Sequence, residues 1–181
     1  MKFCVFGASS NDIDERYIKA GEELGKKMAQ AGHGLVFGGG QTGLMGAVVR
    51  GITEMGGHSV GIAPGFFNEP GILFEECSEF IFTETMRQRK ELMEKKSDGF
   101  IVTPGGIGTF EEFFEIYTLK QLGQHNKPIG ILNTGGYYDE LIAMLGTTVE
   151  KGFMKEECLR LFCVAEEPEK LLEMLEKEYC K

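Results

Sequence analysis

The sequence predicts an α/β protein with a Rossmann-like, doubly wound, mainly parallel sheet and helices on both faces. Short β-rich runs alternate with longer amphipathic segments along the whole chain, which is typical of parallel strands joined by helical crossovers. The 26 glycines cluster at the ends of the predicted strands, where such sheets bind ligands. No linker, repeat or low-complexity tract interrupts the alternation, so we expect residues 1–181 to form a single domain.

Strands and helices alternate from the first residues of the chain. Lys2–Phe6 is predicted as a strand and Asp14–Ala31 as a helix, because Ile18, Leu24 and Met28 recur at helical spacing. The next elements are a strand at Gly34–Phe37, a helix at Gly43–Met55, and strands at His58–Ile62 and Glu79–Phe82, the last two separated by a loop rich in Gly, Pro and Phe.

The second half repeats the alternation. Its predicted elements are a helix at Met86–Lys96, a strand at Phe100–Thr103, a helix at Thr109–Leu122, a strand at Pro128–Leu132, a helix at Tyr137–Glu150, a short strand at Leu161–Val164 and a helix at Pro168–Glu178. The last helix starts with a proline among acidic residues, which suits the positive end of a helix.

Charge and cysteine usage limit the partners. The chain has 19 basic and 28 acidic residues, a formal net charge of −9, so we expect neither nucleic acid nor a membrane as partner. The five cysteines are scattered and form no CxxC pair, which argues against a disulfide framework or a zinc site. There is no signal-type segment and no apolar run of about 18 residues, so we expect a cytoplasmic protein.

Three small-residue clusters follow predicted strands. The first strand ends in Gly7-Ala8-Ser9-Ser10, where Ser9 lies at a turn that a ligand could approach closely, although an ordinary turn has the same composition. The second cluster, Gly38–Gly46, opens a helix, as a phosphate-cradling loop does. It lacks the lysine of an NTPase loop, and its candidate ligand contacts are Gly39, Gly40 and Gly43.

The third cluster, Pro104–Glu112, offers the most complete anion site. Its glycines free the amides of residues 105–109 to point at an anion, the following helix adds a partial positive charge, and Thr109 adds a hydroxyl. Glu112 has two interpretations. It either closes a capping box with Thr109, or it acts on a sugar attached to the bound phosphate.

Arg89 interrupts an apolar stripe on the preceding helix. Its spacing with Met86 and Met93 directs it inward, which is unfavourable unless it meets an anion, pairs with a carboxylate, or extends to solvent. The neighbouring Lys90 either joins the phosphate or lies on the solvated face.

Together these motifs resemble the LONELY GUY family of nucleoside 5'-monophosphate phosphoribohydrolases, long described as possible lysine decarboxylases. Pro104–Glu112 matches the family's PGGxGTxxE, Gly38–Gly46 is similar to its GGGxxGLMG, and Met86–Lys90 is similar to its arginine motif. Gln121–Gly130 resembles its QLG-x-H-x-KP-x-G, and the resemblance runs from about Cys4 to Phe153.

The resemblance implies hydrolysis of a nucleoside 5'-monophosphate, either AMP or a cytokinin riboside monophosphate, to free base and ribose 5-phosphate. It implies a homodimer without metal or cofactor. The essential arginine and glutamate fall on Arg89 and Glu112. The phosphate and sugar contacts fall on Lys90, Gly105, Gly106, Ile107, Gly108, Thr109, Phe110 and Glu111. The loop at Gly65–Ser78 aligns poorly, so a contact from Glu69 stays open, as does one from Tyr117.

Three other functions are weighed against this one. Lysine decarboxylation is rejected because no lysine lies in a recognisable pyridoxal-phosphate setting. A non-catalytic carrier of a nucleotide or molybdenum cofactor has the same fold class, but an anion carrier gains nothing from a carboxylate such as Glu112 beside its site. An interaction protein would use the aromatic helix Thr109–Leu122, whose phenylalanines form the core, as is usual for a buried helix, or also a dimer contact.

Overall fold

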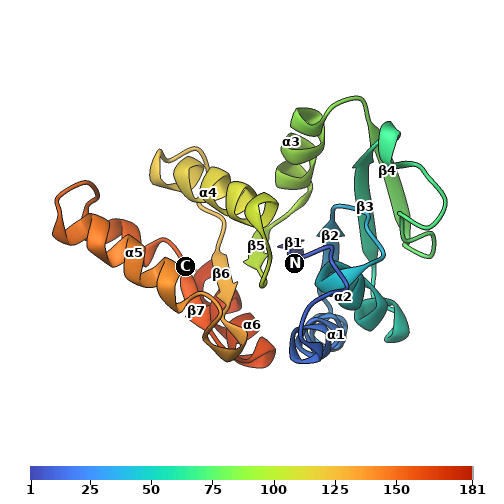
Figure 1. Ribbon diagram of the computed structural model, residues 1–181, viewed down its shortest axis with the longest axis horizontal. Helices are drawn as coiled ribbons and strands as arrows, with labels where there is room; N and C mark the ends of the chain where they lie inside the picture. Colours follow the sequence, from blue (N-terminus) through green and yellow to red (C-terminus); the bar gives the residue numbers. More distant parts are fainter. Residues whose placement is uncertain (181) are drawn as a thin grey trace.

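The computed structural model describes residues 1–180 and shows seven parallel strands in one sheet, in the order β4-β3-β2-β1-β5-β6-β7 (Figure 1). This arrangement confirms the predicted fold class. The strands are β1 (Lys2–Phe6), β2 (Gly34–Phe37), β3 (Ser59–Pro64), β4 (Glu79–Thr83), β5 (Gly99–Val102), β6 (Ile129–Leu132) and β7 (Cys163–Ala165).

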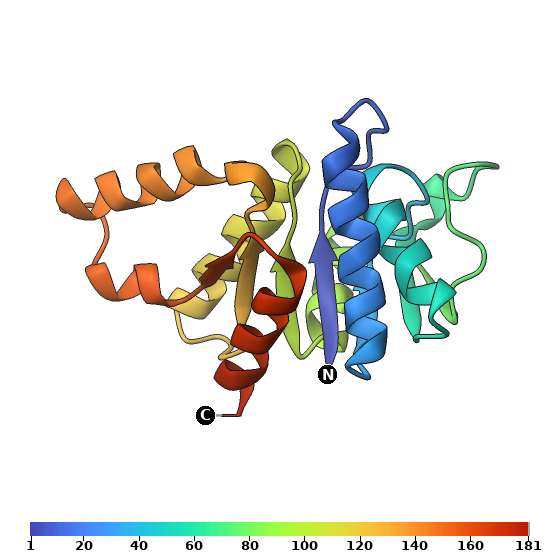
Figure 2. The same ribbon diagram turned by 90° about the horizontal axis from the view of Figure 1, so that it is seen from below.

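Helices cover both faces of this sheet. They are α1 (Glu15–Gln30), α2 (Gly43–Glu54), α3 (Met86–Lys96), α4 (Ile107–Gln121), α5 (Asp139–Glu150) and α6 (Pro168–Tyr179), with short 3-10 turns η1 (Gly65–Phe67), η2 (Thr134–Gly136) and η3 (Glu156–Arg160). The helices α1, α2 and α6 pack on one face, and α3, α4 and α5 lie on the other (Figures 1 and 2). Within residues 1–180, no helix is both long enough and apolar enough to cross a membrane.

Alternation along the strands divides the core into two layers. In β1, Cys4 and Phe6 pack under α3 and α4, whereas Phe3 and Val5 pack under α1, α2 and α6. The central strands are buried on both faces, as a parallel sheet requires, and their sequences are therefore continuously apolar.

The winding direction of the chain reverses beside β1. The chain first runs outward through β2, β3 and β4, and then returns to β5 on the other side of β1. Ligands of doubly wound sheets bind outside the carboxyl ends of the strands at such a reversal. The loops that follow β1 and β5, which begin with Gly7 and Thr103, meet at this point, where the Ala8 amide donates to the Pro104 carbonyl oxygen at 3.1 Å.

The observed boundaries lie within two residues of the predicted ones, and three of the differences have a clear structural reason. The capping box of Thr109 with Glu112 was wrong, because α4 begins two residues earlier, with Gly106 as an N-cap that has no side-chain hydrogen bond. Helix α5 starts at Asp139 because two glycines with positive φ form η2 before it. The last strand is shifted to Cys163–Ala165 because the chain before it winds as η3.

Candidate active site

A cleft of about 540 Å³ opens where the loops after β1, β2 and β5 meet. One end of it is polar and includes an arginine, a glutamate and the first turn of α4, while the other carries apolar side chains from α2, α3 and the loop after η1. Its walls are formed by Gly7, Ala8, Ser9, Gly38, Gly40, Thr42, Met45, Phe67, Gly71, Ile72, Leu73, Met86, Arg89, Gly106, Gly108, Thr109 and Glu112.

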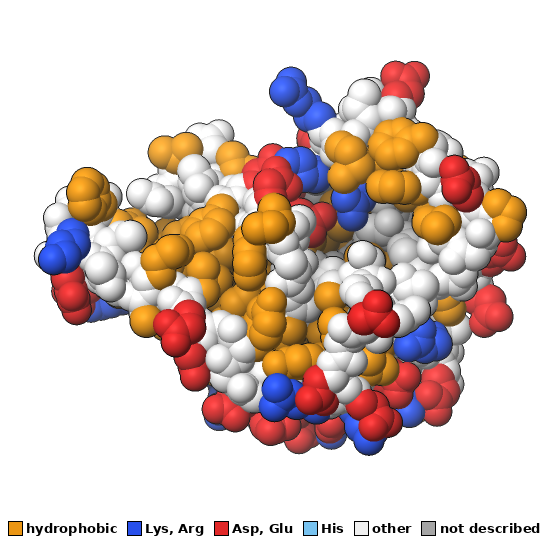
Figure 3. Space-filling model, in the orientation of Figure 1, with side chains coloured by type: hydrophobic (Ala, Val, Ile, Leu, Met, Phe, Trp, Pro, Cys, Tyr) orange, Lys and Arg blue, Asp and Glu red, His pale blue; other side chains and the backbone are white. Residues whose placement is uncertain are grey.

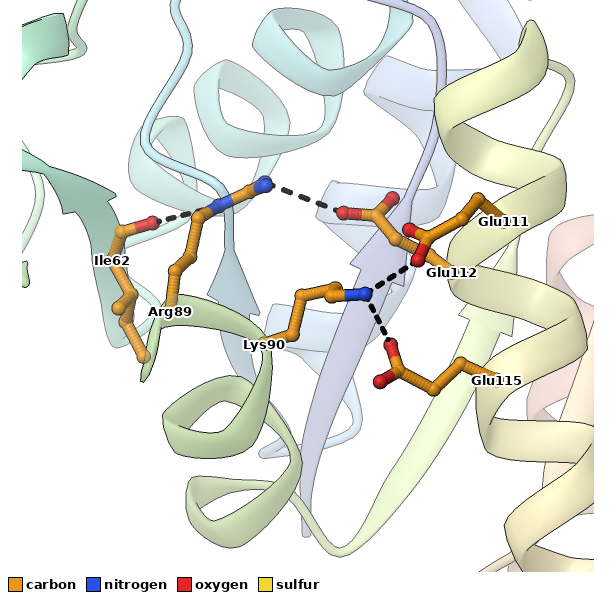
Figure 4. Close-up of polar contacts among 6 residues, drawn as sticks. All are labelled: Ile62, Arg89, Lys90, Glu111, Glu112 and Glu115. Atoms are coloured by element: carbon orange, nitrogen blue, oxygen red, sulfur yellow. Dashed lines mark hydrogen bonds and ion pairs between the residues drawn. The ribbon is translucent and has the colours of Figure 1, made fainter. Parts of the chain in front are cut away.

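Arg89 projects from α3 into this cleft and is only 8% exposed. Its Nε donates a hydrogen bond to the carbonyl oxygen of Ile62 at 3.3 Å, and its Nη2 lies 3.4 Å from Oε1 of Glu112 (Figure 4). A buried guanidinium needs such partners, because desolvation without them is strongly unfavourable. The carboxylate partner considered from the sequence is therefore Glu112 itself, and the two candidate residues form one ion pair.

Glu112 reaches the cleft from α4, with its side chain 13% exposed. Burial raises the pKa of this carboxyl to about 7, against the lowering effect of the Arg89 guanidinium. The neighbouring Glu111 and Glu115 raise the pKa further, and Lys90 lowers it. Glu112 consequently exchanges a proton near neutral pH, and Arg89 holds it ionised only in part.

Gly38 makes room for the guanidinium. A Cβ built on Gly38 would overlap Nη2 of Arg89, so any side chain at this position would displace the arginine from its place beside Glu112. The glycine that follows β2 thus shapes the ion pair, a role distinct from phosphate binding. The sequence showed a glycine cluster at this position but not that Gly38 contacts Arg89.

The first turn of α4 supplies donors at the polar end of the cleft. The first backbone N–H groups of a helix have no intrahelical acceptor, and the helix dipole adds a partial positive charge there. Gly106, Gly108 and Thr109 line the cleft at this end. This arrangement suits an anion such as a phosphate and needs no cationic side chain.

The ligand contacts predicted in the first two small-residue clusters divide into two groups. Ser9 and Gly40 line the cleft. Gly39 and Gly43 are buried behind it, with φ of 81° and 63°, and the Gly43 amide donates to Oδ1 of Asn11 at 2.8 Å. These two glycines hold the loop in shape, while Gly40 forms a bridge with Leu73 that ties the loop after η1 to the cleft.

Lys90 lies on the far side of Glu112 from the cleft. Its Nζ is 2.9 Å from Oε2 of Glu115 and also contacts Glu111 (Figure 4). Lys90, Glu112 and Glu115 border a neighbouring cavity of about 230 Å³. These two salt bridges raise the pKa of Lys90 against the opposing effect of desolvation.

The remaining candidates lie outside the walls of the cleft. Gly105 is buried, Ile107 is 82% exposed, and Phe110 packs against the core. Of the two residues left open, Glu69 is exposed on the loop after η1. Tyr117 is buried, and its hydroxyl donates to the Cys158 carbonyl oxygen at 3.0 Å.

Sequence reasoning missed the apolar end of the cleft. Met45, Phe67, Ile72 and Met86 line it, and they come from segments distant in the chain. The only sequence signal was the Phe-containing loop after β3, which lacks any periodicity. As to metals, no group of three or more His, Cys, Asp or Glu side chains within residues 1–180 is arranged to hold an ion.

Comparison with known sequences identifies relatives along most of the chain. The profile of the "Possible lysine decarboxylase" family matches residues 45–175. The probable cytokinin riboside 5'-monophosphate phosphoribohydrolase LOGL3 of Oryza sativa subsp. japonica is 39% identical over 96% of this chain and 82% of its own length. The cytokinin riboside 5'-monophosphate phosphoribohydrolase LOG2 of Arabidopsis thaliana is 38% identical over 97% of this chain and 83% of its own.

Solved structures share the fold. The molybdenum cofactor carrier protein of Chlamydomonas reinhardtii superposes with a TM-score of 0.75 at 24% identity, covering 99% of this chain and 98% of its own. The molybdenum cofactor binding protein of Rippkaea orientalis has a TM-score of 0.71 at 22% identity, with coverage of 97% and 94%. At these identities the likeness concerns the fold alone.

Proposed function

The chain belongs to the LONELY GUY family, matched by the "Possible lysine decarboxylase" profile, and from this premise we propose that it hydrolyses the N-glycosidic bond of a nucleoside 5'-monophosphate. The products are the free base and ribose 5-phosphate. The observation that carries the proposal is the buried Arg89–Glu112 ion pair beside the amino end of α4. A phosphate at that helix end places the attached ribose within reach of the pair.

The reaction breaks the C1'–N bond while the oxygen of a water molecule bonds to C1'. Positive charge builds on the ribose as this bond breaks, by analogy with glycoside hydrolysis. In its ionised form Glu112 stabilises that charge and accepts a proton from the attacking water. The same proton passes from Glu112 to the nitrogen of the departing base, so Glu112 is ionised again at the end of the reaction. A pKa near 7 suits this proton transfer.

Arg89 and the anion site have binding roles in this scheme. Arg89 contacts an anionic or hydroxyl group of the substrate and lowers the pKa of Glu112. The 5'-phosphate, held at the α4 amino end by Gly106, Gly108 and Thr109, anchors the ribose. Binding energy from such a remote group lowers the barrier at the reacting carbon.

The base occupies the apolar end of the cleft. Met45, Phe67, Ile72 and Met86 present apolar surface there, which suits a planar aromatic base and an apolar substituent on it. AMP and cytokinin riboside 5'-monophosphates are accordingly the proposed substrates, the latter named for the plant relatives. The reaction requires neither metal nor cofactor, and residues 1–181 act as one domain.

A molybdenum-cofactor carrier is the second function considered. It is supported only by the shared fold, and a buried glutamate beside an anion site is unfavourable for simple anion binding.

The five cysteines are free thiols, which favours a reducing compartment, so we propose a cytoplasmic enzyme.

We further propose a homodimer that uses the face between α4 and α5. A broad field of hydrophobic side chains occupies this face (Figure 3). Met144 is 48% and Phe153 87% exposed, and Phe114 is only partly buried. Sedimentation at micromolar concentration is expected to give twice the monomer mass, and Met144→Glu with Phe153→Glu to give monomers. A monomeric wild type would contradict this proposal.

The hydrolase is tested with purified protein and two substrates, AMP and isopentenyladenosine 5'-monophosphate, by following free base chromatographically. We expect base release that is lost in Glu112→Gln and Arg89→Ala. The matched controls, Glu173→Gln and Arg160→Ala, alter exposed residues far from the cleft and should keep activity. Tight nucleotide binding without base release by the wild type would instead indicate a carrier.

A further inference from the structure

Four successive carbonyl oxygens in the loop between β5 and α4 each accept a hydrogen bond from the protein. Two of the four donors are backbone amides, and two are tyrosine hydroxyls. The pairs are Ala8 N to Pro104 O at 3.1 Å, Phe110 N to Gly106 O at 3.1 Å, Tyr138 Oη to Thr103 O at 2.7 Å and Tyr137 Oη to Gly105 O at 2.7 Å.

The two tyrosines are held firmly at the start of α5. The Tyr138 amide donates to Oδ1 of Asn133 at 2.6 Å, and Nδ2 of Asn133 donates to Asp139 at 2.7 Å. The ring of Tyr137 packs edge-on against those of Tyr17 and Tyr138, with centroids 5.8 Å and 4.9 Å away. The ring and the hydroxyl of Tyr137 are therefore already in place before a ligand binds.

The hydrogen bond to Gly105 also fixes a neighbouring amide. In a trans peptide the carbonyl of one residue and the N–H of the next point in opposite directions. Holding the Gly105 carbonyl toward Tyr137 therefore turns the Gly106 N–H away from the tyrosine, and Gly106 lines the cleft. The Gly106 carbonyl is bonded to the Phe110 amide on the other side of the residue, and a Cβ built on Gly106 would meet no atom within 4 Å, so the space beside it is open.

We propose that Tyr137 is a positioning residue, which orients the Gly106 amide toward the substrate's 5'-phosphate. The inference rests on the proposed function for the identity of the ligand. Tyr137 itself is not among the residues that line the cleft, and it acts only through the Gly105–Gly106 peptide. Tyr138 is fully buried, and its hydroxyl donates to Thr103, two residues before Gly105 and directly after β5.

The test compares Tyr137→Phe with the matched control Tyr17→Phe. Both variants keep an aromatic ring in the same cluster, but only the first removes the donor to Gly105, since the Tyr17 hydroxyl pairs with Arg16. The backbone order parameters of residues 105–109 are measured by 15N NMR relaxation on the ligand-free protein. Dissociation constants for ribose 5-phosphate and the kinetics with AMP are then determined.

In Tyr137→Phe we expect a lower order parameter at Gly106, and about tenfold weaker binding of ribose 5-phosphate with an about tenfold higher KM for AMP, the effect of one lost hydrogen bond. The kcat should change much less, and Tyr17→Phe should resemble the wild type. An unchanged order parameter with unchanged binding in Tyr137→Phe, or equal losses in both variants, would overturn the proposal. The order parameter requires no hydrolysis, so it decides the role of Tyr137 even if the wild type releases no base.

Discussion

The raised pKa of Glu112 allows the most direct physical test of the site. Burial raises its pKa from 4.5 to about 7. At about 1.4 kcal/mol for each pKa unit, this difference corresponds to roughly 3.5 kcal/mol between the folded and unfolded states. We expect NMR of the carboxyl carbon of Glu112, in protein labelled at glutamate, to report a midpoint near 7.

Two substitutions should move this pKa in opposite directions. Arg89→Met removes the charge that lowers it, so the midpoint should rise by about 1 to 3 units. Glu111→Gln removes a charge that raises it, so the midpoint should fall. A titration near 4.5 in the wild type, or a lower midpoint in Arg89→Met, would refute the electrostatic reasoning.

The same shift has a consequence for stability, with a defined sign. Between pH 4.5 and about 7 the folded protein holds a proton on Glu112 that the unfolded chain has released, so the contribution to stability falls as pH rises. The free energy of unfolding should therefore decline more steeply across this window in the wild type than in Glu112→Gln. Urea unfolding at pH 4.5 and pH 7.5 measures both slopes, and identical slopes would contradict the raised pKa.

Two further predictions concern packing. Gly38→Ala should lower kcat/KM for AMP about a hundredfold, because a Cβ there displaces the guanidinium of Arg89. The control is Gly146→Ala, on α5 with open space around it. Full activity in Gly38→Ala would show that Arg89 need not be fixed. Phe113→Ala should reduce the free energy of unfolding, measured in urea, by about 3 to 5 kcal/mol, because Phe113 is fully buried between α4 and the sheet. Tyr179 is 53% exposed, so Tyr179→Ala should change this free energy little. Equal effects of the two substitutions would contradict the assignment of the core.

Local patterns were sufficient to predict the sheet, and the element boundaries to within two residues. Strands such as Gly34–Phe37 and the helix Met86–Lys96 were predicted with the bounds that the structure shows, because apolar runs and helical spacing decide them locally. The start of α4 was wrong because the chain offered a side-chain cap at Thr109, whereas the helix begins from the glycine before Ile107 without one.

The site was harder to predict wherever it depends on distant segments. An arginine in an inward position predicts that an anionic partner exists, but only the packing of α3 against α4 makes Glu112 that partner. Likewise, the glycine cluster after β2 suggested phosphate contacts. In the structure the Gly43 amide donates to the side chain of Asn11, and Gly38 makes room for the guanidinium of Arg89. Composition shows that side chains are small there, but not which neighbour requires it.

The arrangement also explains how an acidic chain can bind a dianionic phosphate beside a glutamate. With a net charge of −9 the overall field repels the ligand, so attraction must come from groups within a few ångströms. The amino end of α4 and Arg89 supply it, while the raised pKa leaves Glu112 partly neutral near pH 7. A bound phosphate would raise that pKa further by like-charge repulsion, so Arg89 is the group that limits the rise and keeps part of Glu112 ionised for catalysis. Loss of Arg89 should consequently shift the pH–activity profile to higher pH as well as weaken binding, a combination that removal of a phosphate contact alone would not produce.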